Sequence, residues 1–137
     1  MSARFVVEAD GGSRSNPGPA AYGAVVMDES GQVVAERAEY IGKASNNVAE
    51  YSGLIAGLEA VLELDPTAQV EVRMDSKLVV EQMSGRWKIK HPDMRTLAIR
   101  ARDTFPPEQV TYTWIPRAEN TAADALVNQA LDAALHG

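Results

Sequence analysis

The order of strand-like and helix-like segments is the feature that most limits the folds open to this chain. Apolar and polar residues alternate over residues 3–9, and residues 20–28 and 32–41 are also strand-like. The turn-rich sequence GGSRSNPGP at 11–19 follows the first strand, and the connection Glu29-Ser30-Gly31 favours a hairpin between the second and third strands. These segments predict three consecutive strands that form a meander.

The rest of the chain alternates between helix and strand patterns. Apolar residues recur at spacings of three and four over residues 47–63, at Val48, Tyr51, Ile55, Leu58 and Leu62. The further predicted elements are a strand at 69–74, helices at 76–84 and 92–104, a strand at 109–115 and a helix at 120–135. This order, βββαβααβα, predicts an α/β fold with a five-stranded mixed sheet flanked by helices, built as a single domain over residues 1–137.

The composition excludes several classes of site. The 137 residues include no cysteine, which excludes disulfides, zinc–thiolate sites, iron–sulfur clusters and a cysteine nucleophile. No apolar run is long enough to cross a bilayer, and the N-terminal sequence lacks the features of a secretory signal. We therefore expect a cytoplasmic protein without a membrane partner.

The charge of the chain is acidic overall and uneven in distribution. A net charge of −6 argues against a protein that coats nucleic acid through a broad basic face. Residues 86–102 nevertheless carry six basic side chains against one acid, Asp93. A solvated helix face explains this stretch, and so does a local basic stripe beside an acidic, metal-binding centre.

Four carboxylates stand out because each is predicted near the end of an element. Asp10 ends the first strand and Asp75 the fourth, whereas Glu50 and Asp124 lie in the first turns of two helices. Loops gather at element ends, and sites on α/β sheets form there. Taken singly, each acid also has a structural explanation.

The structural explanations are helix caps and a turn. Asn47 with Glu50, and Thr121 with Asp124, match N-terminal capping pairs. Asp75 is placed to cap the helix that follows it, and Asp10 suits a turn before two glycines.

The four acids together favour metal-assisted hydrolysis. If the first and fourth strands are neighbours, Asp10 and Asp75 meet, and a divalent cation relieves the repulsion between packed carboxylates. Ligands that are all oxygen suit Mg²⁺ or Mn²⁺. Two such ions, about 4 Å apart, can hold a phosphate, activate a water and stabilise the leaving oxygen. The chain has only two histidines, and this chemistry needs none.

Four segments of the chain resemble type 1 ribonuclease H. In order, they are ADGGSRSNPGPAAYGAVV (9–26), SNNVAEYSGLIAGLEA (45–60), MDSKLVVEQMSG (74–85) and TWIPRAENTAADAL (113–126). The resemblance covers nearly the whole chain. It implies the ribonuclease H fold and an endonuclease that hydrolyses the RNA strand of RNA/DNA hybrids and leaves 5′-phosphate and 3′-hydroxyl ends.

The resemblance also implies roles for individual residues. By motif position, Asp10, Glu50, Asp75 and Asp124 are the metal-binding catalytic acids for two Mg²⁺ ions, with Mn²⁺ as a substitute. Asp10 would bridge both ions, Glu50 would serve one and help to orient the region of the RNA 2′-hydroxyl, and Asp124 would serve the other.

A second group of residues is expected to contact the substrate. These residues are Gly11, Gly12, Asn16, Asn46, Asn47, Ser76, Lys77, Trp87, Lys88, Arg117 and Asn120. Glycines allow close approach of the backbone, and amide side chains can read the 2′-hydroxyls that distinguish RNA from DNA. Turns and caps explain the three asparagines at 16, 46 and 47 equally well, and a packed hydrophobic anchor is the alternative for Trp87.

Two departures from the best-known bacterial form matter. The loop at 115–120 lacks that form's histidine, and we expect Arg117 to supply a phosphate contact there; an exposed loop arginine is the alternative. The connection at 85–91 is compact and carries no separate basic protrusion. This pattern resembles the archaeal and actinobacterial branch, which implies additional activity on double-stranded RNA and fusion into a longer chain.

Other classes of protein fit the sequence less well. An exonuclease or an integrase-like enzyme on the same fold would lack the NNxxEY-type and DSK segments seen here. A non-catalytic hybrid-binding module would be expected to have lost one or more of the four acids. A calcium-binding protein would carry its acids in one loop.

We expect the protein to be a monomer.

Overall fold

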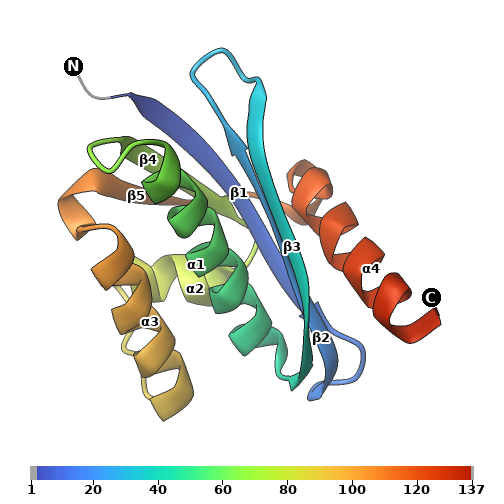
Figure 1. The fold of residues 1–137 in the computed structure, drawn as a ribbon. Coiled ribbons are helices and arrows are strands. Elements are labelled where there is room, and N and C mark those ends of the chain that lie inside the picture. Colours follow the sequence, from blue (N-terminus) through green and yellow to red (C-terminus); the bar gives the residue numbers. More distant parts are fainter. Residues whose placement is uncertain (1–2, 137) are drawn as a thin grey trace.

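The computed structural model describes residues 3–136, which form one five-stranded sheet covered by helices (Figure 1). The strands are β1 (Arg4–Ser13), β2 (Gly18–Met27), β3 (Val33–Ala44), β4 (Gln69–Met74) and β5 (Val110–Trp114). The helices are α1 (Asn46–Leu64), α2 (Lys77–Met83), α3 (Pro92–Thr104) and α4 (Thr121–His136), with short 3₁₀ turns η1 (Pro107–Gln109) and η2 (Arg117–Glu119). The predicted fold class and the order βββαβααβα are confirmed.

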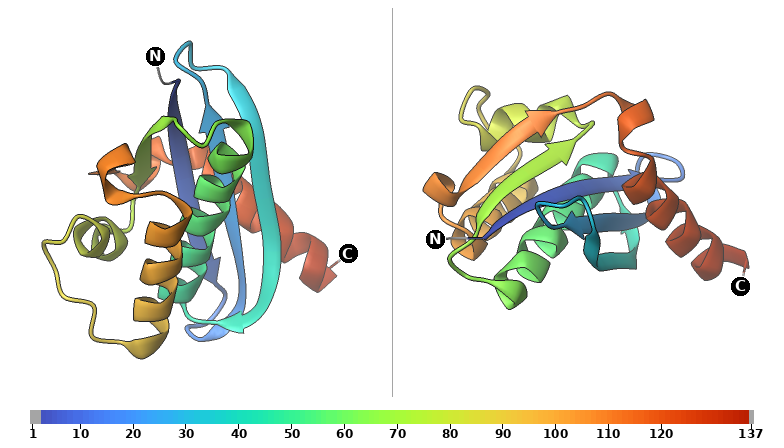
Figure 2. Two further views of the ribbon diagram at one scale, coloured as in Figure 1. Left: turned by 60° about the vertical axis from the view of Figure 1, so that its left-hand side comes forward. Right: turned by 90° about the horizontal axis from the view of Figure 1, so that it is seen from above.

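The sheet is mixed, with strand order β3-β2-β1-β4-β5. β1 pairs antiparallel with β2 and parallel with β4, and β4 pairs parallel with β5. α1 and α3 cover one face of the sheet and α4 covers the other (Figure 2). None of the helices described in residues 3–136 combines the length and the apolar character needed to cross a bilayer.

The first strand is longer than the sequence pattern predicted. The prediction placed a loop at 11–19, but β1 continues through Ser13, because Gly11, Gly12 and Ser13 pair with Tyr22, Ala21 and Ala20 of β2. Asp10 therefore lies within β1 and does not end it. The turn between the two strands is confined to residues 14–17.

The main core lies between the sheet and α1. Val7, Leu54 and Leu58 are completely buried there. The predicted apolar stripe of α1 is correct in its middle, where Tyr51, Ile55 and Leu58 are buried. It is wrong at Leu62, which is 39% exposed in the last turns of the helix.

Glycines let α1 and α4 approach the sheet closely. A Cβ atom on Gly53 of α1 would lie 2.4 Å from the backbone oxygen of Asp10, and one on Gly23 of β2 would lie 2.6 Å from the backbone oxygen of Ala123 in α4. Both helices are thereby held against the part of the sheet that carries Asp10.

Candidate active site

The four predicted acids line one cleft of about 330 Å³. Asp10 comes from β1, Glu50 from the first turns of α1, Asp75 from the residue after β4, and Asp124 from the first turn of α4. The other lining residues are Gly11, Gly12, Ser13, Arg14, Asn46, Arg117, Val127, Asn128 and Leu131. Four acids that are far apart in the sequence are thus brought together by four separate elements.

The parallel pairing of β1 and β4 places Asp10 beside Asp75. The ladder runs from Arg4 opposite Gln69 to Glu8 opposite Arg73, so Asp10 and Asp75 occupy corresponding positions two residues further on. The prediction that strands one and four are neighbours is confirmed. Because the ladder stops before the two acids, their carboxylates stand where the two strands part.

The N-caps of α1 and α2 are serines, not the residues proposed as structural alternatives. Ser45 caps α1 by accepting from the backbone N–H of Val48, and Ser76 caps α2 by accepting from that of Val79. The capping roles considered for Asn47 and Asp75 are therefore wrong. Glu50 and Asp75 are left without a capping function.

Burial and mutual repulsion act on two of the acids. Burial, then the nearby charge of Asp75, raises the pKa of Asp10 to about 8, and Glu50 and Asp124 add smaller repulsions. Burial raises the pKa of Glu50 to about 7, with a further contribution from Asp75, although a hydrogen bond from the Ser76 hydroxyl opposes the rise. Both carboxyl groups therefore carry a cost of ionisation that a bound cation would remove.

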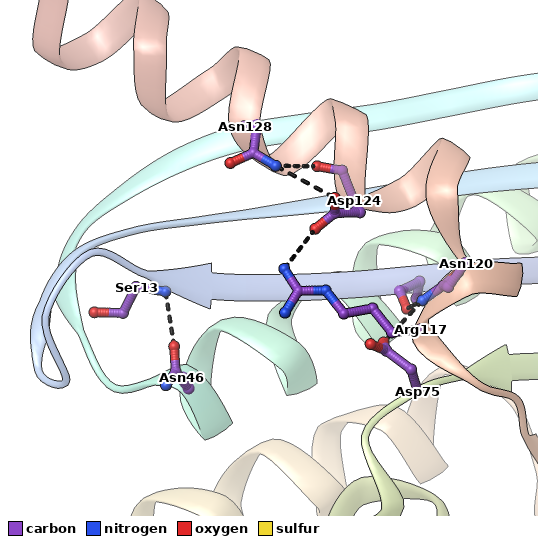
Figure 3. Close-up of polar contacts among 8 residues, drawn as sticks. Ser13, Asn46, Asp75, Arg117, Asn120, Asp124 and Asn128 are labelled. Atoms are coloured by element: carbon purple, nitrogen blue, oxygen red, sulfur yellow. Dashed lines mark hydrogen bonds and ion pairs between the residues drawn. The ribbon is translucent and has the colours of Figure 1, made fainter.

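Asp75 is held by hydrogen bonds from two later residues of the chain, one at the end of β5 and one just before α4. The indole Nε1 of Trp114 donates to the backbone oxygen of Asp75 at 3.2 Å. The side-chain amide of Asn120 donates to Oδ1 of Asp75 at 3.0 Å (Figure 3). The orientation of the Asp75 carboxylate is thus fixed by the protein.

Asp124 lies between a cation and an amide. The Arg117 guanidinium is 3.7 Å from its Oδ1, and the Asn128 amide donates to its backbone oxygen at 3.1 Å and reaches its Oδ2 at 3.4 Å (Figure 3). Arg117 is 81% exposed, so its charge faces solvent and the cleft and is not buried in a structural ion pair.

The donor set fits small, hard cations. All four acids offer oxygen, and Oε2 of Glu50 is buried without a hydrogen-bond partner. Within residues 3–136, no three acidic or histidine side chains are arranged to hold one ion between them. Mg²⁺ is commonly held by one or two carboxylates, with waters and substrate phosphates completing its coordination shell. Two of these four acids per ion are therefore enough protein ligands.

Seven of the predicted substrate contacts lie in or near the cleft. Gly12, Asn46 and Arg117 line the cleft, where the Asn46 Oδ1 accepts from the backbone N–H of Ser13 at 2.8 Å. Asn16 lies at the adjoining turn and accepts from the backbone N–H of Asn46 at 3.1 Å. Ser76, Lys77 and Asn47 are outside the cleft lining, and Lys77 lies 6.0 Å over the Trp114 ring.

Trp87 and Lys88 lie at a separate surface. Together with basic residues they line a shallow hollow of about 560 Å³, whose cations are Arg86, Lys88, Arg95 and Arg102. Trp87 is 45% exposed, which is inconsistent with the alternative of a packed hydrophobic anchor.

One of the predicted contacts, Gly11, also has a role in packing, and another, Asn120, needs correction. Gly11 also lines the cleft, but a Cβ atom on it would lie 2.1 Å from the backbone carbon of Ala49, so its missing side chain makes room for α1. Asn120 is 0% exposed, and its amide is used by the chain itself, so it does not offer a direct substrate contact.

Sequence reasoning missed several residues of the site. Ser13, Arg14 and Asn128 line the cleft, and Trp114 holds Asp75. The spacing of four between Asp124 and Asn128 on one helix was a usable signal, because such residues share a helix face. The role of Trp114 depends on the pairing of β5 with β4, which no local pattern indicates.

Several known proteins are similar to this chain in sequence and in fold. Residues 8–130 match a family model described as reverse transcriptase-like. The bifunctional protein Rv2228c of Mycobacterium tuberculosis is 56% identical over 133 residues, which are 96% of this chain and 36% of that protein. The solved N-terminal RNase H domain of Rv2228c has a TM-score of 0.90 and 56% identity, with 97% of this chain and 96% of that one covered.

Two further solved structures are similar to this chain in fold and in sequence. RNase H1 from the halophilic archaeon Halobacterium salinarum is 45% identical, with a TM-score of 0.88 and coverage of 95% of this chain and 98% of that one. LC11-RNase H1, solved in complex with RNA/DNA hybrid, is 40% identical, with a TM-score of 0.88 and coverage of 96% and 99%. The chain belongs to the type 1 ribonuclease H family. It spans about a third of the length of its mycobacterial relative.

Proposed function

We propose that this chain is an endonuclease that hydrolyses the RNA strand of RNA/DNA hybrids with the help of divalent cations held by Asp10, Glu50, Asp75 and Asp124. The observation that carries the proposal is the gathering of these four acids, from four elements, around one cleft. The relative LC11-RNase H1, whose structure includes an RNA/DNA hybrid, supports the choice of substrate.

The chemistry proposed is phosphodiester hydrolysis with two cations. When bound, two Mg²⁺ ions, or Mn²⁺ as a substitute, would polarise the scissile phosphate and supply a water nucleophile near neutral pH. Asp10 and Asp75, which lie where β1 and β4 part, would face the scissile phosphate. The free Oε2 of Glu50 and the carboxylate of Asp124 complete the donor set.

Arg117 is proposed to meet the phosphate that undergoes cleavage. Its guanidinium lines the cleft and is 81% exposed, so it can move to a substrate phosphate at little cost. A positive charge placed there stabilises the negative charge that builds up on the phosphate oxygens. The products would be a 5′-phosphate and a 3′-hydroxyl.

Recognition of RNA is proposed to come from amides and from the basic hollow. Asn46 and Asn16 lie at one end of the cleft, where their amides can meet 2′-hydroxyls. Trp87 and Lys88 are proposed to hold the DNA strand of the hybrid. Double-stranded RNA carries the same 2′-hydroxyls on both strands, and we propose it as a second, slower substrate of a monomeric enzyme.

The test is a panel of four end-labelled substrates: RNA/DNA hybrid, double-stranded RNA, single-stranded RNA and double-stranded DNA. Each is incubated with Mg²⁺, Mn²⁺ or EDTA, beside the Asp75→Asn variant. Internal cuts in the hybrid's RNA strand that disappear with EDTA and with Asp75→Asn support the proposal. Tight hybrid binding without cleavage in either metal refutes it.

A further inference from the structure

Asn120 is the most deeply buried polar residue beside the acidic cleft. Among residues 3–136 the buried polar side chains are Asn120, at 0% exposure, and Gln82, at 3%. The Oδ1 of Asn120 is buried and has no hydrogen-bond partner. An unpaired buried oxygen is a cost that an apolar residue of the same size would avoid, so packing alone does not explain this asparagine.

The side-chain amide of Asn120 joins two of the acid-bearing strands. Its Nδ2 donates to the backbone oxygen of Ala9 at 2.9 Å and to Oδ1 of Asp75 at 3.0 Å. Ala9 directly precedes Asp10 in β1, so the first bond fixes the backbone that carries Asp10. The second bond fixes the carboxylate of Asp75 itself.

The backbone of Asn120 reaches the third acid. Its carbonyl oxygen accepts from the backbone N–H of Asp124 at 3.2 Å, which sets the first turn of α4. One residue therefore contacts Asp75 directly and the backbones that carry Asp10 and Asp124.

We infer that Asn120 is a positioning residue that holds Asp10, Asp75 and Asp124 at the separation needed to bind divalent cations. This inference rests on the proposed function in treating these acids as cation ligands. Residues that orient metal ligands through hydrogen bonds typically change metal affinity by roughly 10- to 100-fold when they are replaced. Asn120 acts through Asp75 and touches no substrate.

The test is Mn²⁺ binding to the full chain, measured by titration calorimetry without nucleic acid. Asn120→Leu keeps the number and branching of the side-chain heavy atoms and removes both donated bonds. Gln82→Met is the matched control, because Gln82 is also buried and bonded, to the Tyr51 hydroxyl at 2.7 Å, away from the acids. We expect Asn120→Leu to weaken Mn²⁺ binding by roughly 10- to 100-fold. We expect Gln82→Met to leave it at the wild-type value.

Wild-type Mn²⁺ affinity in Asn120→Leu would overturn the inference, as would an equal loss in Gln82→Met. If the leucine variant does not fold, Asn120→Ala, which leaves room for a water, is titrated in its place against the same expectation. A wild-type chain that binds Mn²⁺ but cuts no hybrid would refute the proposed function, while the variants would still decide the role of Asn120.

Discussion

The guanidinium of Arg117 lies 3.7 Å from the carboxylate of Asp124. Their ion pair is largely exposed on the Arg117 side and therefore contributes little to stability. Its position on the cleft lining instead favours a part in the reaction.

We expect Arg117→Ala to lower kcat for hybrid cleavage by about 100-fold, the effect of removing one preorganised group that stabilises developing negative charge. The Tm should stay near the wild-type value. Arg117→Lys, which keeps the charge, should retain more of the rate. Steady-state kinetics on a hybrid of fixed sequence measures kcat for both variants. An unchanged kcat in Arg117→Ala would show that Arg117 takes no part in the reaction.

The raised pKa values of Asp10 and Glu50 should make the metal-free protein less stable as pH rises. Their pKa values are about 8 and about 7 in the folded chain, against ordinary values of 3.8 and 4.5. Between the ordinary and raised values the folded chain binds more protons than the unfolded chain, so the free energy of unfolding falls as pH increases. In EDTA, we expect Tm to fall between pH 5 and about pH 8.

The Asp10→Asn variant isolates this effect. It keeps the shape of the side chain and removes the ionisation, so at pH 8 without metal it should melt at a higher temperature than the wild type. Saturating Mg²⁺ should reduce the fall of the wild-type Tm with pH. Thermal melts that give wild type and Asp10→Asn the same pH dependence in EDTA would contradict the pKa assigned to Asp10.

The neighbouring glycines of β1 should respond differently to a methyl group. A Cβ atom on Gly11 would lie 2.1 Å from the Ala49 backbone, whereas one on Gly12 would lie 3.6 Å from a Val127 methyl. Gly11→Ala should therefore destabilise the fold by roughly 1–3 kcal/mol or more, as overpacking does. Gly12→Ala should unfold at the wild-type denaturant concentration. Equal midpoints in chemical denaturation would mean that Gly11 is not needed for the approach of α1.

Trp87 should contribute to substrate binding and little to stability. It is 45% exposed beside a cluster of arginines and Lys88. Trp87→Ala should weaken hybrid binding by about 1.5–3 kcal/mol if sugars of the DNA strand bury its ring. The control is Leu64→Ala, at an apolar position at the end of α1 that is 48% exposed and does not line the hollow that contains Trp87. Fluorescence anisotropy with a labelled hybrid makes the comparison, and equal affinities in both variants would place the DNA strand elsewhere.

Much of the fold could be predicted from the sequence because its elements have strong local patterns. The alternation in the first part of β1, the strand-like sequence of β2 and the apolar spacing of α1 gave the correct type and order of these elements. The end of β1 was misplaced because Gly11 and Gly12 are usual turn residues, and only pairing with Ala21 and Tyr22 makes them a strand.

The four acids could be found from the sequence, whereas their supporting contacts could not. Asp10 follows the apolar first part of β1 and Asp75 follows the last residue of β4, so both acids could be recognised from their positions in the sequence. The donors to Asp75 are 39 and 45 residues further along the chain, so Trp114 and Asn120 meet it only through the packing of β5 and the start of α4. The amide of Asn120 was predicted to face substrate because its burial has no local signature.

The most direct test of the central claim is the cleavage of an RNA/DNA hybrid, labelled on the RNA strand, by wild type and by Asp10→Asn in Mg²⁺. We predict internal cuts by the wild type, with 5′-phosphate and 3′-hydroxyl ends, and none by Asp10→Asn, although the variant folds and binds the hybrid. Equal cleavage by the two proteins, or cleavage by the wild type that persists in EDTA, would contradict the account.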